Sequence, residues 1–242
     1  MNGCNYISMC VVLSVRKALS TNSKCEFFIP KYVSNAADVC FCDERQGAES
    51  YIEFFNQDRL SELANAYYAE DNHNKGMVVL EWFSGEYSCY SCSSQVLANR
   101  RVYFLKRATL PTERLKCDDE YNKERLIQRL ENVLRLSSEL DGLFQSYFEK
   151  VMRLLTQCDI DSDYEWIEAD IPQRNVLEAC VLIDNMFGGA DTWLDYPLIL
   201  AKKRGIEERF ADVSFKLLDE SKNHLMSVVN HSYTNEYKGY LI

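Results

Sequence analysis

Two hydrophobic patterns divide the chain near residue 117. Before that point the apolar residues form short runs rich in β-branched, aromatic and cysteine side chains, a composition that favours strands. A glycine between two such runs, within 84–86, predicts a β-hairpin. A helical spacing of apolar residues predicts one helix at 51–69. The expected strands are 6–15, 24–33, 39–42, 77–83, 87–92 and 102–105.

After residue 117 the apolar residues follow helical spacing. One stripe advances by steps of four and three, as in a heptad repeat, with Ser137 at its polar position. This stripe predicts either a long core helix of a bundle or a helix that docks a second subunit, and Gly142 in its middle favours a kink or a hairpin. Further helices are expected at 175–187 and 206–229. The stripe comprises Leu126, Leu130, Val133, Leu140, Phe144, Tyr147, Val151 and Leu154.

The change of pattern coincides with a change of charge. Residues 1–117 hold 13 acidic and 13 basic side chains, whereas residues 118–242 hold 24 acidic and 14 basic ones, which accounts for the net charge of −10. We therefore expect an α+β fold with a small, mainly antiparallel α+β domain at 1–117 and an all-helical domain at 118–242.

The longest apolar stretch near the start, residues 7–15, is too short to span a bilayer. Its basic residues, Arg16 and Lys17, follow the stretch rather than precede it, which argues against a signal peptide. We expect a cytoplasmic protein with no membrane partner.

Two pairs of cysteines suggest a metal site. Cys40 with Cys42, and Cys89 with Cys92, lie in or near expected strands, and four thiolates are a ligand set that zinc takes. The alternative is that these cysteines are small core residues, since alternate positions of a strand point to one face. Zinc is the one cofactor that the sequence suggests.

An acidic segment, 159–170, separates two expected helices. Its carboxylates fall at positions 1, 3, 5, 7 and 12 of a calcium-binding loop, but Tyr164 replaces the glycine of the sharp turn and Asp170 replaces the final glutamate. Both departures disfavour calcium. We instead expect Asp161, Asp163 and Glu165 to face a basic protein partner.

A basic strand is the candidate nucleic-acid surface. Arg100, Arg101, Lys106 and Arg107 bracket an aromatic run, so the cations could hold phosphates while a ring stacks on a base. The alternative is a buried strand with charged ends, and no RNA-recognition motif accompanies the run.

The sequence lacks the common catalytic motifs, including the P-loop, G-x-G-x-x-G, G-x-S-x-G and H-E-x-x-H. A metal-dependent hydrolase or nuclease is conceivable from Glu70, Asp71 and Glu81. However, the lysine expected two residues after the last carboxylate is Phe83.

The sequence therefore favours a non-catalytic accessory or adaptor subunit of an intracellular complex, such as a bacterial defence or ATPase-associated assembly. The helical domain would form homo- or hetero-oligomers through stripe positions such as Leu140 and Tyr147, or through the acidic segment. Two alternatives stay open, an acidic inhibitor or immunity-type protein and the hydrolase.

Overall fold

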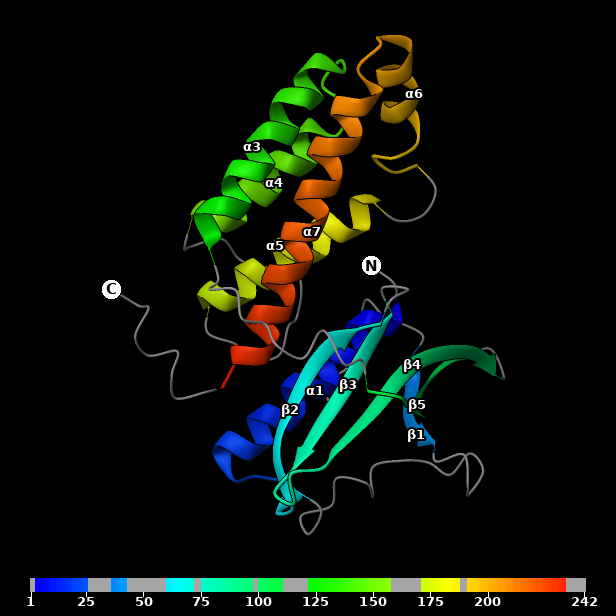
Figure 1. Cartoon of the computed structure of the whole chain (residues 1–242), viewed down its shortest axis with the longest axis vertical. Coiled ribbons are helices and arrows are strands. Elements are labelled where there is room, and N and C mark those ends of the chain that lie inside the picture. The colour runs from blue at the N-terminus through cyan, green and yellow to red at the C-terminus, as the bar shows by residue number, and fades with distance from the viewer. Residues whose placement is uncertain are drawn as a thin grey trace. The chain divides into compact units, whose positions relative to one another are not determined.

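The computed structural model forms two compact units (Figure 1). The sheet unit contains the described residues up to Leu110 together with 229–233, and the helical unit contains those from Asn122 to Val228. The structure describes residues 3–25, 36–42, 60–71, 75–97, 100–110, 122–157, 171–187 and 191–233.

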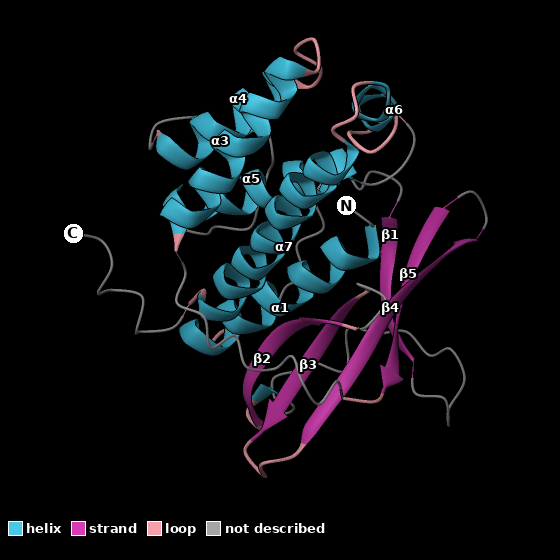
Figure 2. Ribbon diagram, turned by 45° about the horizontal axis from the view of Figure 1, so that its top comes forward, coloured by secondary structure: helices cyan, strands magenta, loops and turns pink. Residues whose placement is uncertain are grey.

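The sheet unit is built on five strands in the order β1-β5-β4-β3-β2 (Figure 2). Strands β2 to β5 are antiparallel, and β1 pairs with β5 in parallel. With helices before and after the sheet, the fold is α+β, as the sequence predicts. The expected hairpin is confirmed, and Gly85 takes a φ of 81° in its turn. The strands are β1 (Ala36–Cys42), β2 (Leu63–Glu70), β3 (Gly76–Trp82), β4 (Tyr87–Leu97) and β5 (Arg100–Ala108).

The first element is a helix, α1 (Gly3–Thr21), so the prediction of a strand at 6–15 is wrong. Every residue from Cys4 to Arg16 is buried, and a run that is buried on every side cannot be assigned to helix or strand by periodicity. Within its unit α1 packs on β2, β3 and β4 (Figure 1).

A close approach of backbones fixes α1 on β3. A Cβ at Gly76 would lie 2.7 Å from the Cα of Asn5, so only glycine fits. The Gly76 N–H donates to Asn5 Oδ1 at 2.7 Å, and Ser8 Oγ donates to the Gly76 carbonyl at 3.2 Å. Two side chains of the helix thus satisfy both backbone groups of one strand residue.

The prediction of a helix at 51–69 is also wrong over most of its described part. Residues 63–69 belong to β2 rather than to a helix. Leu60, Leu63, Ala64 and Tyr67 recur at helical spacing, which explains the error, whereas the strand buries Ala66 and Tyr68, two residues apart. Residues 51–59 lie outside the described part of the chain, as do 26–33 of the expected strand 24–33.

The helical unit follows the predicted order of elements more closely. The helices expected at 175–187 and 206–229 are confirmed, and Pro197 lies in the first turn of its helix, where proline is tolerated. The helices are α3 (Lys123–Glu139), α4 (Gln145–Thr156), α5 (Ile171–Phe187), α6 (Tyr196–Lys203) and α7 (Glu207–His231).

The heptad stripe is divided between two helices that form a hairpin (Figure 2). Gly142 has a φ of 72°, and its neighbours Asp141 and Phe144 each have a φ of 62°, which turns the chain between α3 and α4. Most of the stripe is buried, including Leu126, Leu130, Val133, Leu140, Val151 and Leu154. The stripe therefore supplies the core of the helical unit.

The α3–α4 turn is bound to the turn that follows α6 by the side chain of Arg204. Arg204 binds both carboxylate oxygens of Asp141 at 2.8 Å and also donates to the Glu139 carbonyl. Arg209, in the first turn of α7, forms an ion pair with the Glu139 carboxylate. These charged contacts join α3, α6 and α7 at one end of the unit.

Candidate interaction surface

An aromatic cluster makes the core between α4 and α7. Trp193 is fully buried and donates its indole N–H to Ser214 Oγ at 2.8 Å. Its ring stacks on Phe210 at 5.1 Å between centroids and meets Phe148 edge-on at 5.0 Å. Such ring pairs add to the energy of burial and fix the helices that carry them. The surface of α7 therefore rests on a well-packed core.

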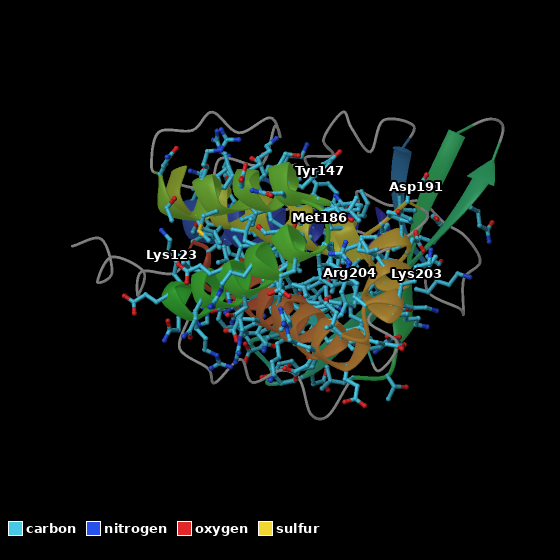
Figure 3. The ribbon with its side chains drawn as sticks, turned by 90° about the horizontal axis from the view of Figure 1, so that it is seen from above. Lys123, Tyr147, Met186, Asp191, Lys203 and Arg204 are labelled. Atoms are coloured by element: carbon cyan, nitrogen blue, oxygen red, sulfur yellow. The ribbon has the colours of Figure 1, made fainter. Side chains whose placement is uncertain are left out.

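Among the described residues of the helical unit, four large apolar side chains remain exposed. They lie on three helices. One of them, Tyr147, extends the aromatic cluster outward, since its ring is 5.9 Å from that of Phe144, which in turn meets Trp193 edge-on at 6.0 Å. Figure 3 marks the position of Tyr147 on α4. Exposed aromatic side chains are enriched where proteins bind one another. The four residues are Tyr147, Tyr196, Ile199 and Phe215.

Phe215 has the most distinctive surroundings of the four. It lies on α7 in a line with Glu208, Asp212 and Asp219, at helical spacings of four, three and four residues. All four side chains are exposed, and the Phe215 side chain is 48% exposed. We call these four residues the α7 outer stripe.

The charges of the α7 outer stripe are mostly uncompensated. Asp212 pairs with Lys216 at 2.7 Å on the same helix, an exposed contact of small energy. Within the part of the chain that the structure describes, Glu208 and Asp219 form no ion pair. An apolar ring among carboxylates is suited to a partner surface with an apolar pocket and a basic rim.

The structure places the residues predicted to bind a partner in different environments. Leu140 is fully buried and caps α3, so it is a core residue rather than an exposed position. Tyr147 is 56% exposed, as partner binding requires. Asp161, Asp163 and Glu165, like the rest of the acidic segment 159–170, lie outside the described residues.

The structure does not gather the four predicted zinc ligands. Cys40 and Cys42 lie on β1 and the other pair on β4, with β5 between them, so the two strands are about 10 Å apart. Cys89 packs with Met77 on one face, whereas Cys92 lies on the opposite face. Among the described residues no three potential ligands form a metal site. Zinc binding stays a prediction that this arrangement does not support.

The environments of the β4 cysteines are those of core residues. Burial raises the pKa of Cys89 to about 11. A hydrogen bond with the Cys4 thiol of α1 raises the pKa of Cys92, and burial adds to the effect. Both groups therefore stay thiols at neutral pH, the form that does not ligate metal.

The basic strand does not present its four cations on one face. It is β5, which lies between β1 and β4. Because successive residues alternate across a sheet, Lys106 and Arg107 point to opposite faces, and Arg100 is about 20 Å along the strand from Lys106. Nucleic-acid contact stays a prediction.

The carboxylates of the hydrolase alternative are also far apart. Glu70 pairs with Gly76 at one end of the β2–β3 ladder, and Glu81 pairs with Asn65 at the other. Glu70 is buried and accepts a hydrogen bond from Tyr68 at 3.0 Å, on the face opposite to Glu81. The geometry therefore gathers no cluster of Glu70 with Glu81 around one metal ion.

Glu81 instead belongs to a polar network that the sequence pattern did not reveal. Its two carboxylate oxygens accept hydrogen bonds from Tyr67 at 2.7 Å and from Tyr87 at 2.9 Å. Asn65 donates to the Tyr67 hydroxyl at 3.1 Å and accepts from Arg16 at 2.7 Å. Burial and the bond to Glu81 raise the pKa of Tyr67 to about 12. The network extends from a buried arginine to a partly exposed carboxylate.

The α7 outer stripe was missed as well, although its period is visible in the sequence. Glu208, Asp212, Phe215 and Asp219 recur at helical spacing, opposite to Phe210, Leu217 and Leu225, which are buried. A phenylalanine on the polar side of an amphipathic helix was the available signal.

Comparison of the chain with protein-family models, with curated protein sequences and with solved structures finds no match. Among the helices that the structure describes, none combines the length and the apolar character needed to cross a membrane.

Proposed function

We propose that this chain is a non-catalytic adaptor, an accessory subunit that binds a protein partner through its helical unit. The observation that carries the proposal is the half-exposed Phe215 at the centre of the α7 outer stripe. Removing such a ring from water favours association, and a few aromatic anchors usually contribute most of the energy of an interface.

The charges of the α7 outer stripe indicate what kind of surface the partner would present. Glu208, Asp212 and Asp219 flank the ring along the helix, and the half of the chain that carries them holds 24 acidic and 14 basic side chains. A partner with lysines or arginines around an apolar pocket would gain both contacts, and its association would be steered by the opposite charges. We place this interaction in the cytoplasm.

The experiment compares two phenylalanine variants of the whole chain. An affinity-tagged chain is expressed in its source cells, and the proteins retained at stoichiometric yield are quantified by mass spectrometry. Phe215→Ser should lower the yield of the partner at least about tenfold, as loss of an interface anchor does. The matched control is Phe83→Ser, because Phe83 is even more exposed, at 74%, but lies in the sheet unit.

A charge-reversal arm tests the chemistry of the partner. Glu208→Lys with Asp219→Lys should weaken the same interaction, and the wild-type complex should weaken as salt rises from about 0.05 to about 0.5 M, because screening reduces attraction between exposed charges. The proposal fails if Phe215→Ser retains every partner, or if Phe83→Ser loses the same one.

A further inference from the structure

His224 is a buried residue of α7 whose two ring nitrogens both face carbonyl oxygens. Nδ1 lies 2.8 Å from the carbonyl oxygen of Glu220, one turn earlier on the same helix. Nε2 lies 2.9 Å from the carbonyl oxygen of Asn122, at the start of α3. Both distances are those of good hydrogen bonds.

A carbonyl oxygen can only accept a hydrogen bond, so each ring nitrogen must carry a proton to bind its partner. A neutral imidazole has one protonated nitrogen, and its other nitrogen would point a lone pair at an oxygen lone pair. The site therefore matches the doubly protonated, positively charged ring.

We propose that His224 is a pH-sensitive latch, which holds the first turn of α3 to α7 when its ring is doubly protonated and releases it when the ring loses a proton. The inference is independent of the adaptor function.

The charged groups around the ring support a cation at this point. The Oε1 atom of Glu220 is 3.5 Å from Nδ1, and its Oε2 atom binds Nε of Arg125 at 2.7 Å. The Glu220 carboxylate thus lies between Arg125 of α3 and the imidazolium of α7. It offsets part of the cost of burying the positive charge of the His224 ring. On α5, which meets α7 where Ser221 donates to the Cys180 carbonyl at 3.4 Å, the buried titratable groups are Glu178 and Cys180.

The bond to Asn122 matters because this residue caps α3. The Asn122 side chain accepts from the Arg125 N–H at 3.0 Å, and its carbonyl accepts from the N–H groups of Arg125 and Leu126. His224 thus binds the same carbonyl that starts the helix. When the ring loses a proton, one of its two hydrogen bonds becomes repulsive, and the first turn of α3 should fray.

The first test observes the ring of the wild-type protein directly. Long-range ¹H–¹⁵N correlation spectra distinguish a ring with two protonated nitrogens from either neutral tautomer. The spectrum of His224 at about pH 5.5, in the range where histidine is ordinarily charged, should show two protonated nitrogens. A neutral ring at that pH overturns the proposal, and this measurement needs no variant.

The second test measures the latch by hydrogen exchange in the first turn of α3. Between about pH 5.5 and about pH 8.5, the protection factors of its amides should fall about tenfold in the wild type, as expected for loss of one charged hydrogen bond. In His224→Gln they should be low at both pH values, because glutamine cannot donate to both carbonyls and does not titrate. His231→Gln changes a histidine at the end of the same helix and should keep the wild-type response.

Equal protection at both pH values in the wild type overturns the proposal. So does a pH response that survives in His224→Gln, since another group, such as Glu220 or Glu178, would then carry it. If His224→Gln fails to fold, as judged by circular dichroism, the ring spectrum and the wild-type exchange profile still decide the matter.

Discussion

The side chain of Asn230 binds both backbone groups of Tyr68, as a neighbouring strand would. Its Oδ1 accepts the Tyr68 N–H at 2.6 Å, and its Nδ2 donates to the Tyr68 carbonyl at 2.9 Å. Tyr68 lies on β2, the last strand of the sheet order. Arg16 donates to the next outward carbonyl, that of Ala66, at 2.9 Å. Side chains therefore close an edge that could otherwise pair with another chain.

Replacing Asn230 should open this edge. Asn230→Ala leaves two backbone groups of Tyr68 without their partners, which should lower the free energy of unfolding by about 1–3 kcal/mol. Urea denaturation measures the loss, and hydrogen exchange at the Tyr68 amide shows where it arises. Asp219→Ala, on the exposed side of the same helix, should change stability by less than about 0.5 kcal/mol. Equal losses in the two variants would contradict the assignment.

The contact between α1 and β3 should not tolerate a methyl group. Gly76→Ala would place its Cβ 2.7 Å from the backbone of Asn5, so the helix must move and its hydrogen bonds with the strand must lengthen. We expect a loss of about 2–3 kcal/mol on thermal or urea unfolding. Gly85→Ala is the control, since it has a positive φ but open space, and backbone strain alone costs about 1–2 kcal/mol. A smaller loss for Gly76→Ala than for Gly85→Ala would show that the approach is loose.

The fold was predictable where sequence periodicity has one interpretation. The helix α7 repeats apolar residues at helical spacing over 25 residues, and the β3–β4 hairpin has two strand-like runs around a glycine, so both were found. Residues 4–16 of α1 are all buried, so no exposed polar side marks them as helical, and their β-branched residues misled the assignment. Burial on all sides removes the pattern that distinguishes a helix from a strand.

The candidate surface was less predictable than the fold, because surfaces depend on which elements meet. The heptad stripe suggested an interface, yet pairing of α3 with α4 buries most of it. Spacing within a helix could not reveal that Leu140 faces the core while Tyr147 faces outward, since a hairpin turn separates them. The His224 site joins residues 102 positions apart, and no local pattern indicates it.

Variants of the heptad stripe should distinguish its buried residues from its exposed ones. Leu140→Ala removes a fully buried side chain and should destabilise the helical unit by about 2–5 kcal/mol. Tyr147→Ser changes an exposed ring and should cost less than about 1 kcal/mol, although it can weaken binding of a partner. Urea denaturation followed by circular dichroism measures both. If Leu140→Ala keeps wild-type stability but changes the native mass of the protein, the stripe is an interface after all.

Two cysteines should report unfolding through their reactivity. Burial raises the pKa of Cys10 and of Cys180 to about 12, so neither thiol ionises near neutral pH. Because the thiolate is the nucleophile, iodoacetamide at about pH 8 should leave both unmodified in the native protein and alkylate both in urea, as peptide mass spectrometry can show.

Because the pKa values of Cys10 and Cys180 are raised, the free energy of unfolding should fall at alkaline pH. In the unfolded chain these thiols ionise near 9.0, well below their folded values of about 12. Their contribution to stability is therefore complete below about pH 9, and it is lost as pH rises toward about 12, because the unfolded state gives up its protons first. Cys10→Ala with Cys180→Ala should flatten this alkaline decline, measured as urea midpoints at a series of pH values. Alkylation of either thiol in the native protein at the rate of the unfolded chain would show that the site is open to solvent.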